Sequence, residues 1–581
     1  MFIFQSFLIF RKIKGYIEKD NGLIMYFFCL TIELNLCYTY TSENKTILTN
    51  FFLKSNKHLR NKIKRTIKTV TTNMNLKFLL SFLILLVTWP ALAQISQPLR
   101  YEIEIDNSYD EYNIVSAEEN GLFLFKELQE KSTFKELHWQ IIRLDTSLQE
   151  TSRREVIIDS KFTFKGYSYA DDQLVLLFQE GYEFAKDLLF ITFSIRGNSF
   201  QSYLYENLVP IQLTEFEAKN DAVIFGGNVN MRTVVMVYNF TARKGVVLPG
   251  FYNDRSSLLQ ISTDTKDDYF RVITSDRMPN KRFGISVRAY STMGEQIFTD
   301  QLIAKEDLSL TDGRIVNSSE GGNLLAGTYS ANKRIETSRG IFVADFNKVS
   351  QNQINYYNYG ELENFFNYMR ERKKERILKR IARKKVKGRK LRFSYRLFVQ
   401  DIIKQNNENI LIGEAYYPTY TNRQRGFDPY TMSASYSHGG SSVQAFDGYK
   451  YTHAVIMAFD NNGKLLWDNS FEINDLKSFN LEEHVHLAFL ENEIVMLYLY
   501  NQHLKIKVIK NNEIVEGKYT EELRLMYEND EIRANDEDLE GLEHWYGNNF
   551  YAHGVNRVKN LRDANIKLNR KVFFINKIVV K

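Results

Sequence analysis

The sequence is short of cysteine and of net charge, and both shortages exclude whole classes of protein. Only 2 of its 581 residues are Cys, which excludes a disulfide-stabilised scaffold. The 76 Lys and Arg nearly balance the 70 Asp and Glu, and 44% of the residues are hydrophobic, which excludes a disordered chain. The chain can therefore bury a core, and its length fits three or four domains or one large all-β architecture.

The sequence also lacks the motifs of the commoner catalytic and cofactor sites. It contains no Gly-x-Ser-x-Gly elbow, no His-Glu-x-x-His zinc motif and no glycine-rich phosphate loop. His484 and His486 would share one face of a strand, but no third ligand stands at a diagnostic spacing. We therefore predict no catalytic residue, no cofactor and no metal.

A secretion signal stands well inside the chain. Residues 74–77 carry one Lys, residues 78–87 form an apolar run, and the small residues Ala91 and Ala93 complete the cleavage pattern. We predict that residues 74–93 are a signal peptide.

The position of this signal makes the preceding residues anomalous. We interpret residues 1–73 as an upstream leader that results from a misplaced start codon, with Gln94 as the first mature residue. The alternative is a signal-anchor whose basic residues stay in the cytoplasm. In both cases residues 94–581 are predicted to be periplasmic or secreted, and they contain no cysteine.

A short motif recurs along the predicted mature chain, in which an aromatic residue is followed four positions later by Gly. Copies begin at Phe193, Tyr290 and Phe459, and a copy one residue longer begins at Phe240. Weaker anchors without the Gly stand at Leu144, Phe346, Ile509 and Ile575. The anchors recur about every 50 residues, with one interval about twice as long that we interpret as a unit with insertions.

Strand-like runs rich in Val, Ile, Leu, Tyr and Phe precede these anchors, and Asn-Gly-type turns separate them. Repeated small antiparallel sheets of this length are typical of a β-propeller, in which each blade buries its faces against its neighbours. We predict an all-β fold, a propeller of seven or eight four-stranded blades over residues 94–581. The strand at residues 99–105 would pair with residues 570–581 and close the ring.

The segment Ala458–Trp467 combines a strand, an acidic turn, a Gly and a Trp. It resembles the turn of quinoprotein-like and WD40-like propeller repeats. The whole chain resembles the exported propeller-like proteins of bacteria, a likeness that assigns no site residue and implies no quinone.

One segment interrupts the β pattern. Residues 361–385 contain no Gly or Pro and run from acidic to basic residues, which suits the dipole of a helix, and residues 370–392 hold 14 Lys and Arg against two Glu. We predict a helical insertion over residues 361–392 that binds an anionic lipid or polysaccharide, whereas nucleic acid is not expected for an exported protein. The alternative is a solvated helix that binds nothing. The predicted contacts are Arg370, Arg372, Lys373, Lys374, Arg376, Lys379, Arg380, Arg383, Lys384 and Lys385.

A second insertion is rich in tyrosine. Residues 414–452 have the composition of a long loop, and such loops are commonly functional or disordered. Tyrosine has a flat apolar face and a polar tip, so we predict a site for a glycan or a peptide; the alternative is that the rings merely cover a blade. The predicted contacts are Tyr416, Tyr417, Tyr420, Tyr430, Tyr436, Tyr449 and Tyr451.

These observations favour an exported, non-enzymatic propeller that binds a protein or glycan partner, or assembles with it, at the cell envelope. The alternative is a propeller hydrolase acting on polysaccharide, which would need two carboxylates facing one cleft. The available aspartates mostly occupy turn sequences, where Asp is favoured for the turn itself; they are Asp145, Asp345, Asp428, Asp447 and Asp460.

Overall fold

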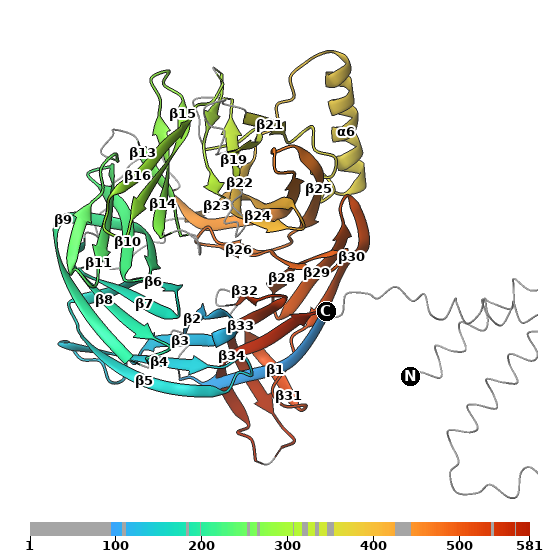
Figure 1. Ribbon diagram of the computed structural model, residues 1–581. Coiled ribbons are helices and arrows are strands. Elements are labelled where there is room, and N and C mark those ends of the chain that lie inside the picture. The colour runs from blue at the N-terminus through green and yellow to red at the C-terminus, as the bar shows by residue number, and fades with distance from the viewer. Residues whose placement is uncertain are drawn as a thin grey trace, which may run out of the picture. The chain divides into compact units, whose positions relative to one another are not determined.

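Over the residues that it describes, the computed structural model shows a ring of eight β-sheet blades and one α-helix (Figure 1). The structure describes residues 95–106, 112–181, 185–197, 199–251, 256–263, 268–305, 307–315, 324–331, 336–345, 354–423, 443–535, 540–563 and 565–581. The predicted leader and signal peptide lie outside these residues. No helix among the described residues is long and apolar enough to cross a membrane.

The first four blades follow one another along the chain, and each runs from an inner to an outer strand. The 21-residue strand β9 (Ser199–Lys219) serves two of them, because its first half pairs with β8 and its second half with β10. Blade 1 is β2 (Asn113–Ser116), β3 (Leu122–Glu127), β4 (Glu136–Leu144) and β5 (Glu150–Asp159); blade 2 is β6 (Phe162–Ala170), β7 (Gln173–Glu180), β8 (Ala185–Ser194) and β9; blade 3 is β9, β10 (Ala222–Val229), β11 (Arg232–Asn239) and β12 (Lys244–Val247); blade 4 is β13 (Ser256–Thr263), β14 (Tyr269–Arg277), β15 (Phe283–Ser291) and β16 (Gln296–Leu302).

The last four blades carry the irregular features. The helix α6 (Glu371–Val386) lies between blades 5 and 6, whereas the first four blades hold only a short 3-10 turn among their described residues, η1 (Glu118–Asn120) in blade 1. Blade 5 is β17 (Ser309–Leu310), β18 (Arg314–Ile315), β19 (Leu324–Ser330), β20 (Gly340–Asp345) and β21 (Ile354–Asn358); blade 6 is β22 (Arg396–Gln405), β23 (Glu408–Arg423), β24 (Val443–Phe459), β25 (Leu465–Glu472) and β26 (Lys477–Ser478); blade 7 is β27 (His486–Phe489), β28 (Ile494–Tyr500), β29 (His503–Lys510) and β30 (Glu513–Glu522); blade 8 is β31 (Asp530–Asn535), β32 (Gly541–Tyr546), β33 (Asn549–Asn560), β34 (Asn569–Val580) and β1 (Ile95–Glu104).

The core consists of eight buried hydrophobic clusters, one at each junction between successive blades. Strand β3 shows how the sequence produces this arrangement, because side chains alternate between the faces of a strand. Its Leu122 and Leu124 pack with Phe573 of blade 8, and its Phe123 and Phe125 pack with blade 2. Each blade is therefore apolar on both faces and needs two neighbours.

The predicted repeat is confirmed, and the number of blades is eight. The anchors that the structure describes, apart from Ile575 in the middle of β34 (Asn569–Val580), lie at or just after the end of the third strand of a blade, as Phe193, Tyr290 and Phe459 do, and these three are buried. The turn after Phe459 is held by Asp460, whose Oδ1 accepts hydrogen bonds from the backbone N–H groups of Asn462 and Lys464. Asp therefore serves the turn itself here, as predicted. The long interval contains α6 and an extended hairpin in blade 6.

The ring closes where the sequence predicts. Strand β1 pairs antiparallel with β34, from Ile95 opposite Val580 to Glu104 opposite Val572. The N-terminal strand thus becomes the outer strand of blade 8, whose other strands come from the end of the chain (Figure 1).

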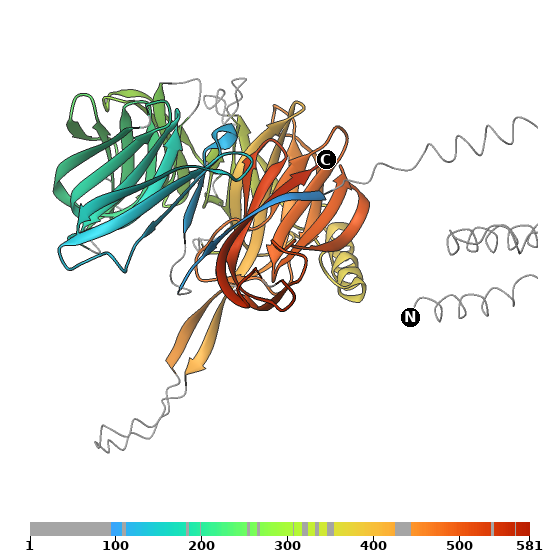
Figure 2. The same cartoon turned by 90° about the horizontal axis from the view of Figure 1, so that it is seen from below.

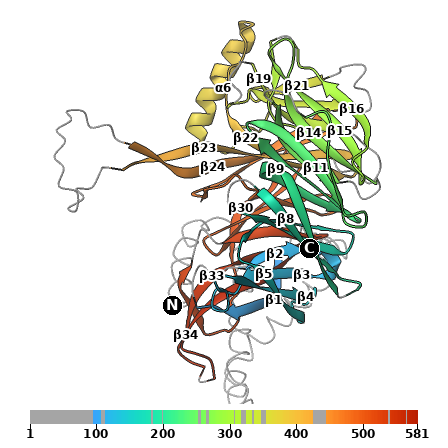
Figure 3. The ribbon, with the colours of Figure 1, turned by 90° about the vertical axis from the view of Figure 1, so that its left-hand side faces the viewer.

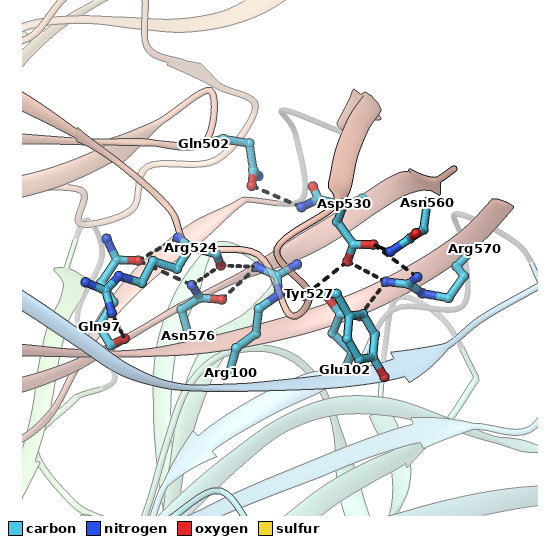
Figure 4. Close-up of polar contacts among 11 residues, drawn as sticks. Gln97, Arg100, Glu102, Gln502, Arg524, Tyr527, Asp530, Asn560, Arg570 and Asn576 are labelled. Atoms are coloured by element: carbon cyan, nitrogen blue, oxygen red, sulfur yellow. Dashed lines mark hydrogen bonds and ion pairs between the residues drawn. The ribbon is translucent and has the colours of Figure 1, made fainter. Parts of the chain in front are cut away.

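Buried charges reinforce this closure (Figure 4). The Arg570 guanidinium lies 2.7 Å from the carboxylate of Asp530 in β31 and 3.4 Å from that of Glu102 in β1. Glu102 also accepts a 2.7 Å hydrogen bond from Arg100, whose Nη1 donates to Asn576 Oδ1 at 2.7 Å. We call Glu102, Asp530 and Arg570 the latch, since they join the first strand of the ring to the last blade.

Candidate functional site

Strands β23 and β24 extend out of blade 6 as a two-stranded ribbon, residues 416–423 and 443–451 (Figures 2 and 3). Their pairing continues to Arg423 opposite Val443. The pairing of β23 with its other neighbour, β22, ends earlier, at Tyr416 opposite Arg396. The expected loop over residues 414–452 is therefore wrong for the described part, because alternating Tyr and Thr favour strands. Residues 424–442, with Tyr430 and Tyr436, lie outside the described residues.

Five aromatic side chains form a continuous ladder along the ribbon. Neighbouring ring centroids lie between 5.0 and 6.2 Å apart. The contacts join Tyr420 to Phe446, Phe446 to Tyr449, Tyr449 to Tyr416, and Tyr416 to Tyr451. The ladder therefore runs without a break from the ring towards the end of the described ribbon.

Exposure rises along the ladder. Tyr451 at the ring is 1% exposed, whereas Phe446 and Tyr420 at the far end are 42% and 56% exposed. Four predicted contacts thus meet in the ladder, together with Phe446, which sequence reasoning missed. Tyr417 pairs with Lys450, and alternation of side chains along a strand places it on the opposite face of the ribbon.

Gly448 keeps the ladder on one face. The pairing shifts between Pro418 and Tyr420, so β24 carries an extra residue there. Gly448 lies in this bulge with φ +98°, and a Cβ at this position would lie 2.9 Å from the backbone O of Ser478. Only glycine suits both the backbone angle and the space.

At the root of the ribbon, a carboxyl group is fully buried. Glu414 Oε1 accepts hydrogen bonds from Gln400 Nε2 at 2.5 Å and from the backbone N–H groups of His484 and Val485 at 2.9 and 2.8 Å. Among the described residues no group donates to its Oε2. Burial raises the pKa of Glu414 to about 8, so it is a neutral acid that fastens the segment before β27 to blade 6.

The predicted helix is present but begins later than expected, at Glu371. Residues 361–370 make turns instead, because their backbone bonds to blade 6. The carboxylate of Asp468 accepts hydrogen bonds from the N–H groups of Glu363 at 2.9 Å and Asn364 at 2.7 Å. Together with buried Leu362, Phe365 and Phe366, these contacts hold the insertion against blades 5 and 6.

Helix α6 buries only Ile381 and presents most of its surface to water. Its ion pairs are internal, Lys374 with Glu371 and Lys379 with Glu375. Of the ten predicted contacts eight are exposed and two, Lys374 and Lys384, are half-buried. The helix therefore displays a dense positive charge and little apolar surface for insertion into lipid.

Inner strands line a cavity of about 230 Å³. Glu215 and Glu217 of β9 reach it from blade 3, Arg314 from blade 5, and Glu483 from the segment before β27 in blade 7. Carboxylates from distant blades thus face one space, which the spacing of residues along the sequence does not reveal.

A fourth carboxylate lies nearby on the inner strand of blade 8. Glu543 of β32 reaches solvent at its surface. Desolvation by the surrounding protein is the larger cause, and repulsion from Glu483 and Glu482 the smaller one, that raises the pKa of Glu543 to about 8. A Glu whose pKa is raised beside other carboxylates is an arrangement that acid–base catalysis can use.

Two histidines of the last third of the chain, His484 and His486, pack against aromatic rings. His484 packs edge-to-face on Tyr451 of blade 6, whereas His486 packs against Phe550 of blade 8, so they do not share the expected face. Burial lowers the pKa of His484 to about 3 and of His486 to about 4. Within the described ranges, no three His, Cys, Asp or Glu side chains are grouped as a metal ion requires.

No family model and no curated protein matches the chain. Among solved structures, the WD40 domain of SCAP from fission yeast is 7% identical with a TM-score of 0.34, over 83% of this chain and 98% of that one. Polysaccharide lyase Uly1 is 8% identical with a TM-score of 0.34, over 71% and 89%. A prolyl endopeptidase is 9% identical with a TM-score of 0.30 over 75% of this chain, which spans 53% of that protein. We draw no function from these likenesses.

Proposed function

We propose that the protein is an exported, non-enzymatic module that binds polysaccharide at the cell envelope through the aromatic ladder of its ribbon. The observation that supports this most is the exposed end of the ladder, where Tyr420 and Phe446 stand in line with half-buried Tyr449 and Tyr416. Soluble proteins rarely expose a contiguous row of large apolar side chains unless it contacts something.

A polysaccharide suits this surface for a physical reason. Aromatic rings offer flat apolar faces, and tyrosine adds a hydroxyl that bonds to a polar ligand. A linear polymer can contact several rings in succession, and each contact adds to the affinity without a deep pocket. The cations of α6 add long-range attraction if the polymer is acidic, and salt would weaken this contribution.

The experiment compares retention of the exported protein on polysaccharide gels, using neutral and acidic polymers. The variant Tyr420→Ser/Phe446→Ser should lose at least tenfold in affinity for the polymer that retains the wild type. Phe134→Ser is the matched control, because Phe134 is an aromatic residue 86% exposed on blade 1. Equal retention of all three proteins would overturn the proposal.

Export is tested separately. The predicted signal peptide implies that the mature protein begins at Gln94 and is found in the periplasm or the medium. N-terminal sequencing of the fractionated protein should give Gln94, and a cytoplasmic protein that begins upstream of residue 74 would contradict it.

One observation favours a second candidate, a polysaccharide hydrolase. Glu215, Glu217 and Glu483 line one cavity, and the raised pKa of Glu543 would suit a general acid. Reducing-end release from the retained polymer decides between the candidates. Release that disappears in Glu543→Gln would establish the hydrolase, and no release above a blank would exclude it.

A further inference from the structure

A cavity of about 610 Å³ lies between blade 5 and the chain that follows α6, on a part of the molecule distinct from the ribbon. Tyr329 of β19 and Tyr356 of β21 line one side, and Lys390 and Arg392 of the segment after α6 line another. Arg339, just before β20, completes the lining used in this argument. The volume lies within the range of small-ligand sites.

The three cations of this cavity are available to a ligand. Arg339 is half-buried, and Lys390 and Arg392 are exposed. Over the described ranges of the chain, none of the three forms an ion pair or donates a side-chain hydrogen bond. A half-buried guanidinium without a carboxylate partner favours an anion, and its planar fork fits a carboxylate or sulfate group in bidentate fashion.

The tyrosines add hydroxyl groups to the lining. Tyr329 and Tyr356 pack edge-to-face with their centroids 5.1 Å apart. Burial raises the pKa of Tyr329 to about 12 and also raises that of Tyr356, so both hydroxyls stay protonated and can donate. Two such hydroxyls can donate hydrogen bonds to the oxygen atoms of a ligand.

Two carboxylates that line the same cavity restrict the class of ligand further. Asp307 and Glu361 also line it, and an inorganic anion would be repelled by both. A ligand with hydroxyl groups can instead donate hydrogen bonds to them while its own anionic group meets the cations. The combination of cations, carboxylates and tyrosine hydroxyls therefore fits a sugar residue that carries an acidic group.

We propose that this cavity binds one acidic sugar residue of a polysaccharide, with Arg339 holding its carboxylate or sulfate. The inference rests on the proposed polysaccharide-binding function and names the class of polymer. Lys390 and Arg392 lie on the segment that leaves α6, so the exposed cations of the helix continue from the cavity and attract the rest of the polymer. The cavity would recognise one sugar residue of the polymer, and the helix would contribute only electrostatic attraction.

The test measures binding of three probes by calorimetry: trigalacturonate, a sulfated disaccharide and neutral maltotriose. The wild type should bind at least one acidic probe and should bind maltotriose at least tenfold more weakly; which acidic probe it prefers distinguishes a uronate from a sulfate ester. Arg339→Gln should lower affinity for that probe at least tenfold. Arg392→Gln, at an exposed position where folding is not at risk, should lower it three- to tenfold.

Arg389→Gln is the matched control, because Arg389 is an exposed cation of the same segment that does not line the cavity. It should change affinity less than twofold. Equal losses for Arg389→Gln and Arg339→Gln would mean unspecific attraction and would overturn the proposal, as would no binding of either acidic probe.

The two proposals fail in different ways. If retention on a neutral polymer depends on the ribbon and no acidic probe binds, the cavity proposal is wrong and the ribbon proposal stands. An acidic probe could bind in a way that depends on Arg339 and is unchanged in Tyr420→Ser/Phe446→Ser. If that variant also bound every gel as the wild type does, the cavity proposal would stand and the ribbon proposal would be wrong.

Discussion

The latch and the root of the ribbon bury carboxyl groups in opposite ways. At the latch, Asp530 and Glu102 form ion pairs with Arg570, with Asp530 only 2.7 Å from the guanidinium. At the ribbon root, Glu414 accepts only neutral donors, and burial raises its pKa to about 8. The buried carboxyls of the latch are therefore stabilised by a cation, whereas the buried carboxyl of Glu414 is stabilised by protonation.

This difference follows from what each region must do. The latch joins segments more than 400 residues apart in sequence, and a charge pair with fixed geometry helps to define that match. The ribbon root only anchors a neighbouring segment, so neutral hydrogen bonds are sufficient. Beyond the root, the ribbon has no neighbouring strand on most of its length, and its aromatic surface stays open to a ligand.

The largest effect should come from pH at the ribbon root. Glu414 has a folded-state pKa near 8 and an unfolded-state value near 4.3, so the folded protein binds more protons in this interval and its stability falls as the pH rises. Relative to Glu414→Gln, the wild type should lose up to about 1.4 kcal/mol per pH unit between pH 5 and 8. Denaturant unfolding at several pH values measures this. Parallel curves for the two proteins would show that Glu414 is ionised.

The latch should give the next largest effect. Arg570→Met leaves Asp530 buried without its cation and leaves Glu102 with Arg100 alone, and breaking a buried pair costs about 3–5 kcal/mol in comparable cases. The matched control is Lys567→Met, which breaks the ion pair between Lys567, just before β34, and Glu104 of β1. Both partners there are exposed, so the loss should stay under about 1 kcal/mol. Similar losses in urea unfolding would contradict the distinction between buried and exposed pairs.

The ring was predictable from the sequence, because short apolar runs with alternating faces leave each blade dependent on two neighbours. Leu122 and Phe123 serve adjacent clusters, and this pattern recurs around the ring. Closure was predictable for the same reason, since an unassigned first strand and an incomplete last blade complement each other. The helix followed from its charge pattern, but its start did not, because a distant Asp468 determines it.

The ribbon and the cavities were not predictable in this way. Tyr, Ser and Gly in residues 414–452 resemble a loop. Tyr and Thr favour strands there, but the extra residue in the bulge at Gly448 interrupts the regular alternation of side chains. The ladder, the latch and the carboxylates of the inner cavity each combine residues from distant segments. Glu217 and Glu483, for example, lie far apart in the sequence, and no sequence pattern relates them.

A smaller effect is expected at the bulge of the ribbon. Gly448→Ala places a Cβ 2.9 Å from the Ser478 carbonyl oxygen and strains a backbone with φ +98°. The ribbon should lose about 1–3 kcal/mol of local stability, because such strained positions cost this much. Amide hydrogen exchange should show faster exchange in residues 443–451, while the latch strands exchange as before. Gly517→Ala is the control, since no atom lies near the added methyl group there.

The smallest effect on stability should come from the exposed end of the ladder. Tyr420→Thr and Phe446→Thr keep strand-forming residues on a surface that packs against nothing else described, so each should change the free energy of unfolding by less than about 0.5 kcal/mol. Tyr451→Ala, at the buried end of the same ladder, should instead destabilise the fold strongly, because it leaves a cavity. If the two ends cost the same, the whole ladder belongs to the core and its exposed rings are not kept for a ligand. A loss of polysaccharide retention without a loss of stability would place the ladder among binding surfaces.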